Sequence, residues 1–230
     1  MKEKILCIET STSVCSVALS IAGEAIEVAE LSSGMQHGEQ ITLLIRQCMD
    51  QAGLKLAQLD AIAVSSGPGS YTGLRIGVST AKGLCMALAK PLIAISSLEI
   101  LAYGVQNTFK DGIIMPMIDA RRMEVYTATF DHHYQRLTSE EAIIIDDKYA
   151  DLFIDERIVL IGDGYEKTLP YWSKSKIIAG SNRTSAAFMA LPAQKMYQIK
   201  NFSNFLNFSP FYLKSPNITA SGNSGRKIEN

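Results

Sequence analysis

The sequence has few of the side chains from which metal and disulfide sites are built. Its four cysteines, at positions 7, 15, 48 and 85, lie in apolar segments without C-x-x-C spacing. This pattern indicates small buried hydrophobic residues in a reducing compartment, and it argues against disulfides and zinc ligation. Only three histidines are present and no H-E-x-x-H motif occurs, so a zinc peptidase of that class is excluded.

An excess of charge of one sign is also missing. The chain has 22 basic and 23 acidic residues, a formal net charge of −1 and no basic run, which argues against autonomous nucleic-acid binding. The N-terminal apolar segment is broken by Glu9 and is too short for a secretory signal or a membrane span. With 230 residues and 47% hydrophobic composition, we expect a cytoplasmic globular protein with no membrane contact and a sizeable core.

The most informative stretch covers residues 60–90. An apolar run meets the turn-forming cluster Ser65–Gly69, and a long segment suited to a helix follows. A phosphate-binding P-loop is excluded because Leu74-Arg75 stands where Lys and Ser or Thr are needed. A dinucleotide fingerprint is excluded by the glycine spacing and by Pro68, which has no N–H. The stretch predicts a buried strand, a turn capped by Ser70 or Thr72, and a helix.

This helix has a wider apolar arc than one sheet needs. The arc spans roughly 220°, whereas a helix on a sheet needs about 100°, and Gly73, Gly77 and Ala81 recur at every fourth position. The small residues fit either intrachain packing or a partner helix. We expect a partner protein to cover the surplus, together with the amphipathic segment 39–52, and we expect Arg at Gly77 or Val78 to abolish pairing without disturbing the fold. The residues expected to dock the partner are Ile41, Leu44, Ile45, Cys48, Leu74, Gly77, Val78, Ala81 and Cys85.

The pattern of elements repeats along the chain. Strands are predicted at residues 4–9, 14–21 and 24–31, a helix at 39–52, a strand at 60–66, the central helix, a strand at 92–95 and a helix at 96–105. A second set follows, with strands at 113–118, 123–130, 136–145, 158–161 and near 177, and helices after 145 and at 184–198. The repeat predicts two α/β subdomains with mixed sheets flanked by helices, at 1–106 and 107–200. Residues 201–230 are expected to form a strap held by Phe202, Phe205, Phe208 and Phe211, with a disordered tail from Ser215.

Three motifs resemble the TsaB (YeaZ) family: GPGSYTGLRIGVSTAKGL at 67–84, DARRMEVY from Asp119, and PFYLK from Pro210. The resemblance implies a fold of two ribonuclease-H-like halves, as in actin, hexokinase and Hsp70. It also implies a non-catalytic scaffold that pairs with the enzyme TsaD, or with itself when TsaD is missing. The reaction served would be transfer of a threonylcarbamoyl group to N6 of adenosine 37 in tRNAs that read codons beginning with A.

The resemblance also bears on cofactors and further partners. TsaD-type subunits carry His-Met-Glu-Gly-His where this chain has Ser97 to Leu101, so no metal site is expected here. ATP and metal are expected on partner subunits, including a TsaE-type ATPase, and tRNA is expected to be held mainly by the complex. The alternative is an autonomous ATP-hydrolysing or phosphotransferase enzyme of the same superfamily.

That alternative needs a nucleotide site, and the chain offers few candidates for one. In the superfamily the first hairpin turn and the acid before it hold phosphate and metal, but the same turn residues are also good turn formers. The family usually has Asp in place of Glu9. Asp119, Arg121 and Glu124 could also form an ion network across the second hairpin. The weak nucleotide-site candidates are Glu9, Thr10, Ser11, Thr12, Asp119, Gly162 and Gly164.

Overall fold

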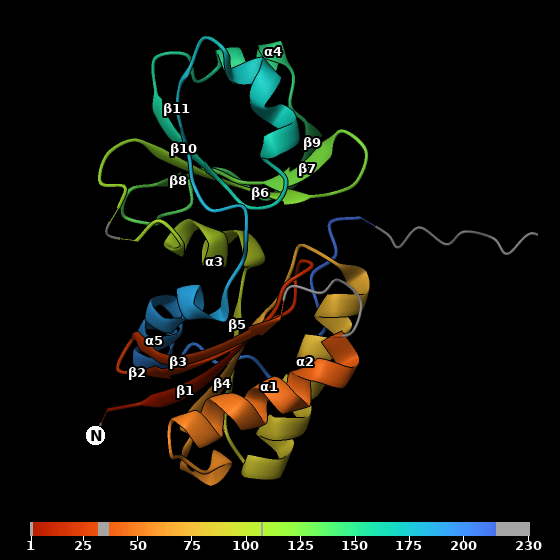
Figure 1. The fold of residues 1–230 in the computed structure, drawn as a ribbon, viewed down its shortest axis with the longest axis vertical. Coiled ribbons are helices and arrows are strands. Elements are labelled where there is room, and N and C mark those ends of the chain that lie inside the picture. The colour runs from red at the N-terminus through yellow and green to blue at the C-terminus, as the bar shows by residue number, and fades with distance from the viewer. Residues whose placement is uncertain (1, 32–36, 107, 215–230) are drawn as a thin grey trace, which may run out of the picture.

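A computed structural model describes residues 2–31, 37–106 and 108–214, which form two lobes stacked along the long axis (Figure 1). The first lobe contains β1 (Lys4–Glu9), β2 (Cys15–Ile21), β3 (Glu24–Leu31), α1 (His37–Gln51), β4 (Ala61–Ser65), α2 (Tyr71–Leu88), β5 (Leu92–Ile95) and α3 (Ser97–Tyr103), with a 3-10 turn at Leu56–Gln58. The second contains β6 (Ile113–Asp119), β7 (Glu124–Thr127), β8 (Phe130–Asp131), β9 (Glu141–Ile144), α4 (Asp147–Asp151), β10 (Arg157–Ile161) and β11 (Lys176–Ala179). A 3-10 segment at Glu166–Trp172 precedes β11, and another at Ala186–Met189 leads into α5 (Ala190–Gln198).

Both sheets have the same strand order, which confirms the predicted duplication. The first sheet runs β3-β2-β1-β4-β5, and the main path of the second runs β9-β7-β6-β10-β11. The central strand of each sheet has one antiparallel and one parallel neighbour. β1 pairs antiparallel with β2 and parallel with β4, and β6 pairs antiparallel with β7 and parallel with β10. Each lobe is therefore ribonuclease-H-like.

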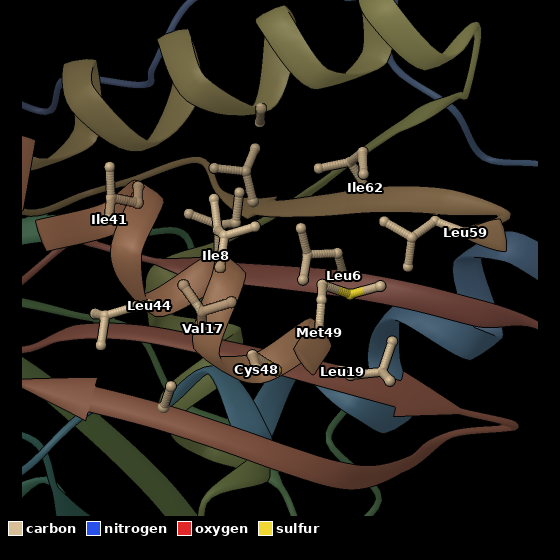
Figure 2. Close-up of a cluster of buried hydrophobic side chains, with 14 of the residues drawn as sticks. Leu6, Ile8, Val17, Leu19, Ile41, Leu44, Cys48, Met49, Leu59 and Ile62 are labelled. Atoms are coloured by element: carbon tan, nitrogen blue, oxygen red, sulfur yellow. The ribbon is translucent and has the colours of Figure 1, made fainter. Parts of the chain in front are cut away.

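The central strands of the first lobe are continuous apolar runs because helices cover both faces of the sheet. On one face, side chains from α1 point toward those of β1 and β2, as the labelled residues in Figure 2 show. On the other face, Met189 and Ala193 pack against Ile5 and Cys7. α5 thus belongs to the first lobe, although the sequence places it in the second subdomain at 107–200. The reason is that the chain returns to the first lobe after β11 and packs there on the first sheet.

The residues predicted to dock a partner are buried within this chain. Leu74, Ala81 and Cys85 of α2 and Cys48 of α1 are fully buried, and Gly77 is buried as well. The other four, Ile41, Leu44, Ile45 and Val78, are at most 5% exposed. The prediction that these side chains form an exposed docking surface is therefore wrong in this structure.

The physical reason is that α2 has three neighbours in its own chain. One side of its apolar arc packs on the first sheet and another against α1. The C-terminal strap covers a further part, because Phe205 and Phe208 pack on the same cluster and Lys82 donates hydrogen bonds to the carbonyls of Leu206 and Phe208. Of the four strap aromatics, Phe202 and Phe211 remain 38% and 49% exposed, so only two hold the strap by burial. The predicted tail from Ser215 lies outside the described residues.

Candidate functional site

A cleft of about 660 Å³ opens between the two lobes. Its walls are the β1–β2 turn and the start of α2 from the first lobe, and the β6–β7 hairpin and Asp163 from the second. The strap residues Tyr212, Leu213 and Lys214 complete it. The fold therefore brings the β1–β2 turn, the β6–β7 hairpin and the 162–164 turn to one place, although they are far apart in the sequence.

The small-residue stripe of α2 positions the floor of this cleft. A Cβ on Gly73 would lie 2.1 Å from the Thr10 carbonyl oxygen, and one on Gly77 would lie 2.2 Å from Thr10 Oγ1. Ser70 caps α2 by accepting a hydrogen bond from the Gly73 N–H at 3.2 Å, and its own N–H donates to the Ser11 carbonyl at 2.6 Å. The two alternatives for the stripe are therefore resolved in favour of intrachain packing. Close contact with the β1–β2 turn requires glycine at these positions.

Glu9 lies beneath the floor of the cleft and is fully buried. Its Oε1 accepts a hydrogen bond from the Ser11 N–H at 2.6 Å, and Oε2 has no partner among the described residues. Burial raises the pKa of Glu9 to about 7, although hydrogen bonds from Ser11 and Ser65 act in the opposite direction. The fold therefore leaves one oxygen of this buried carboxyl group without a hydrogen-bond partner among the described residues.

The turn above Glu9 offers hydroxyl groups to the cleft. Ser11 and Thr12 line it, and Ser11 Oγ has no partner among the described residues. Thr12 Oγ1 is instead 2.7 Å from Thr184 Oγ1, and Thr10 points toward Gly77. His37, the first residue of α1, also lines the cleft and is 8% exposed. This turn could accept hydrogen bonds from a ligand or donate to an anion.

On the opposite wall, lysines rather than Arg121 balance the acids. Lys167 Nζ forms an ion pair with Asp119 and donates to the carbonyls of Arg122 at 2.9 Å and Glu124 at 2.7 Å. Lys214 pairs with Glu124. The predicted network of Asp119, Arg121 and Glu124 is therefore wrong in its partners, because Arg121 reaches Asp119 only through its backbone N–H, at 3.0 Å.

Two neighbouring arginines of the β6–β7 hairpin have left-handed backbone conformations. Arg121 has φ 68° and Arg122 has φ 53°, and both side chains are exposed. This conformation costs an L-residue roughly 1–2 kcal/mol, and glycine or asparagine usually occupies it. Lys167 holds the hairpin in this shape through the carbonyls of Arg122 and Glu124.

The 162–164 turn contributes through its central acid and not through its glycines. Asp163 Oδ1 accepts the Asp119 N–H at 2.9 Å, and burial raises the pKa of Asp163. A Cβ on Gly162 would lie 2.3 Å from the Met117 carbonyl oxygen, and one on Gly164 would lie 2.8 Å from the Ile118 carbonyl carbon. Packing against β6 therefore explains both glycines without any ligand.

Several residues in or beside the cleft were not predicted as site residues, although most of them lie in motifs of the sequence. Tyr71 and Tyr212 place their ring centroids 4.8 Å apart, and the Arg75 guanidinium lies 5.4 Å from the Tyr71 centroid. Lys167 acts here without belonging to a recognisable motif. Asp163 lies in the turn between Gly162 and Gly164, and Tyr71, Arg75, Tyr212 and Lys214 lie in the motifs at 67–84 and 210–214.

The cleft and the rest of the described chain hold few features of metal or membrane proteins. Within those ranges no group of three or more His, Cys, Asp or Glu side chains could hold a metal ion. In the same part of the chain, no helix combines the length and the apolar character needed to cross a bilayer. All four cysteines are free and buried, and burial raises the pKa of Cys15 to about 11.

Comparison with known proteins gives consistent matches. A family model described as tRNA N6-adenosine threonylcarbamoyltransferase matches residues 30–203. The tRNA threonylcarbamoyladenosine biosynthesis protein TsaB of Haemophilus influenzae is 29% identical, over 92% of this chain and 93% of that protein. TsaB of Buchnera aphidicola subsp. Schizaphis graminum is 31% identical, over 73% of this chain and 81% of that protein.

A solved structure agrees with these relatives. YeaZ from Pseudomonas aeruginosa superposes with a TM-score of 0.81 at 26% identity, covering 92% of this chain and all of that one. The family model spans well over half of this chain, and the Buchnera relative is matched over more than two thirds of its own length. From the two-lobed fold and these matches together, we conclude that this chain belongs to the TsaB (YeaZ) family.

Proposed function

We propose that this chain is a non-catalytic subunit in the biosynthesis of threonylcarbamoyladenosine on tRNA. It pairs with a TsaD-type catalytic subunit and supports transfer of the threonylcarbamoyl group to N6 of adenosine 37 in tRNAs that read codons beginning with A. ATP and metal are held by the partner subunits, which include a TsaE-type ATPase. Family membership supports the pathway, and the finer assignments are part of the proposal.

The observation that carries the non-catalytic assignment is the environment of α3. By the resemblance to the family, Ser97 and Leu101 stand where a TsaD-type subunit carries its two histidines, and in this chain both are fully buried. Leu101 packs in the apolar cluster on the second sheet together with Leu98 and Ile118. Positions that would carry metal ligands in a catalytic relative therefore contribute to the core between the lobes in this chain.

The docking surface is assigned to the outward faces of α1 and α2, since their inward faces are buried. Met86 is 75% exposed and Leu43 is 52% exposed. Gly83 lies on the exposed side of α2, and a Cβ there would have no atom within 4 Å. A glycine inside a helix costs about 1 kcal/mol relative to alanine. Close approach of a partner backbone would give this glycine a reason that no described residue of its own chain supplies.

Replacing Gly83 tests this docking face without disturbing the core. Gly83→Arg should fold normally, because its side chain enters open space, and should weaken co-purification with a TsaD-type subunit. The matched control is Gln198→Arg on α5, which is exposed and belongs to the other face of the sheet. tRNA modification by the catalytic subunit should need the native chain and should fall with Gly83→Arg but not with Gln198→Arg.

Two results decide between a scaffold and an enzyme. We expect the same face to form a homodimer when the partner is missing. Unchanged pairing of the Gly83→Arg chain with a TsaD-type subunit would refute the docking face. Purified chain with ATP and Mg²⁺ tests the alternative of an autonomous ATP-hydrolysing or phosphotransferase enzyme. Turnover by the chain alone would overturn the non-catalytic assignment.

A further inference from the structure

Three arginines lie in the segments that border the cleft, and we call Arg75, Arg121 and Arg122 the arginine rim. Arg121 lines the cleft, Arg122 follows it in the β6–β7 hairpin, and the Arg75 guanidinium contacts the ring of Tyr71, which also lines the cleft. All three side chains are exposed. In the described part of the chain none of them forms an ion pair with an acid.

Two of the three acids near the rim are neutralised by lysines. Asp119 is paired with Lys167, and Glu124 is paired with Lys214. The remaining acid, Asp163, is exposed, lines the cleft and accepts the Asp119 N–H. Three arginines without an ion pair outnumber this one acid, so the charge that the rim presents to solvent is positive, although the whole chain has a formal net charge of −1.

A stack of planar groups extends from the same rim. The Tyr212 and Tyr71 rings lie 4.8 Å apart with a tilt of 39°, and the Arg75 guanidinium lies 5.4 Å from the Tyr71 centroid. The strap fixes Tyr212 because the Phe211 N–H donates to the Ser66 carbonyl at 2.7 Å. An exposed guanidinium held on an aromatic ring is a plane on which an unpaired base can stack.

The β6–β7 hairpin has arginines at two positions whose left-handed backbone conformation disfavours side chains. Arg121 and Arg122 have positive φ, where glycine would be accommodated more easily. No contact of either guanidinium within the described residues explains why long cationic side chains occupy these positions. Local strain that packing does not explain is typical of functional positions.

We propose that the arginine rim and the Tyr71–Arg75 stack contact a single-stranded loop of RNA. This inference rests on the proposed function, in which the substrate of the complex is tRNA. The arginines neutralise backbone phosphates, and the guanidinium plane of Arg75 receives an unstacked base. Double-stranded RNA fits less well because its bases are stacked inside the helix. Three arginines give weak, salt-dependent binding that adds to the contacts made by the partner subunits.

The test measures binding of the full-length chain to a fluorescent RNA hairpin with a single-stranded loop, at about 50 mM salt. The Arg121→Gly, Arg122→Gly double variant should bind about tenfold more weakly. Its salt dependence should also be shallower, by about 0.7 in log–log slope for each phosphate that is no longer neutralised. Its melting temperature should not fall, since glycine suits the two left-handed positions. Arg46→Ala on α1, also exposed, is the control that should leave binding unchanged.

Three outcomes would overturn the proposal. The double variant could bind the hairpin as well as the native chain does. A fully paired RNA duplex could bind as tightly as the hairpin, which would leave only general phosphate attraction. Finally, the double variant could keep its RNA affinity and lose its pairing with the TsaD-type subunit, which would make the rim a protein contact.

The failure of this proposal is distinguishable from failure of the proposed function. Gly83→Arg removes pairing in the proposed function, but its arginine rim is intact, so RNA binding by the isolated chain should persist. Loss of RNA binding in the rim variant together with normal pairing supports the RNA contact separately from the docking face.

Discussion

Gly77 provides a quantitative test of how α2 is placed on the β1–β2 turn. Replacing it with alanine puts a Cβ 2.2 Å from Thr10 Oγ1, whereas ordinary contacts begin near 3.4 Å, so Thr10 must move by about 1 Å. Overpacking of this kind costs about 1–3 kcal/mol, and the gain in helix propensity returns at most about 1 kcal/mol. The Gly77→Arg substitution predicted from sequence to leave the fold intact cannot do so.

Gly83 on the same helix supplies the matched control. A Cβ at Gly83 meets no atom within 4 Å, so Gly83→Ala should gain helix propensity without a steric cost. The free energy of unfolding, measured in urea, should therefore be about 1–3 kcal/mol lower for Gly77→Ala than for Gly83→Ala. Equal values for the two variants would refute the close approach of α2 to Thr10.

A double variant identifies the atom responsible. Thr10 Oγ1 has no hydrogen-bond partner among the described residues, so Thr10→Ala should cost little by itself. In the Gly77→Ala background it removes the clashing oxygen and should recover most of the lost stability. The two substitutions should therefore be non-additive by roughly 1–2 kcal/mol. Additivity would locate the strain elsewhere.

Three further predictions concern the cleft. Burial raises the pKa of Glu9 from 4.5 to about 7, so its stabilising contribution is complete below about pH 4.5 and is lost as pH rises through 7. At pH 8 the free energy of unfolding of Glu9→Gln, measured in urea, should therefore exceed that of the native chain by up to about 3 kcal/mol, with little difference at pH 4.5. A native chain whose stability did not decline between these pH values relative to Glu9→Gln would contradict this. Lys167→Met leaves the Arg122 and Glu124 carbonyls without their donor and should destabilise the fold by about 1–3 kcal/mol, with limited proteolysis cutting first in the β6–β7 hairpin; protection of that hairpin would count against the role of Lys167. Lys214→Ala removes a half-exposed pair with Glu124 and should change stability by at most about 1 kcal/mol while exposing the strap to protease, and a strap as resistant as in the native chain would show that Lys214 does not hold it.

Much of the fold was predictable because it is determined by local periodicity. The strands at Lys4–Glu9, Glu24–Leu31 and Leu92–Ile95 have the predicted bounds, and Ser70 caps α2 as one of the two predicted caps. The strand predicted at 136–145 is observed only over Glu141–Ile144, and the segment at 184–198 contains a 3-10 turn before α5 instead of one continuous helix. Its place on the first sheet depends on contacts with Ile5 and Cys7 that no local pattern contains.

The candidate site was predictable only in part. The turn at Ser11 and Thr12 and the acid Asp119 do line one cleft. Lys167 and the role of Asp163 could not be found, because each residue acts through a contact with the β6–β7 hairpin more than 40 residues earlier in the chain. The arc of α2 was misassigned for the same reason, since Phe205 and Phe208 cover it from a strap that begins more than 110 residues after the helix ends.

The two glycines of α2 explain why an apolar or small-residue pattern cannot by itself identify an interface. Gly77 and Gly83 have the same side chain in the same helix, and the sequence favoured Gly77 because it lies in the stripe with Gly73 and Ala81. The environment reverses the assignment: Gly77 is required by Thr10 of its own chain, whereas none of the described residues places an atom within 4 Å of the Cβ position of Gly83. A glycine that packing within the chain already requires gives no information about a partner. A helix glycine that no described contact explains does give such information. A docking assay should therefore alter Gly83 and leave Gly77 unchanged.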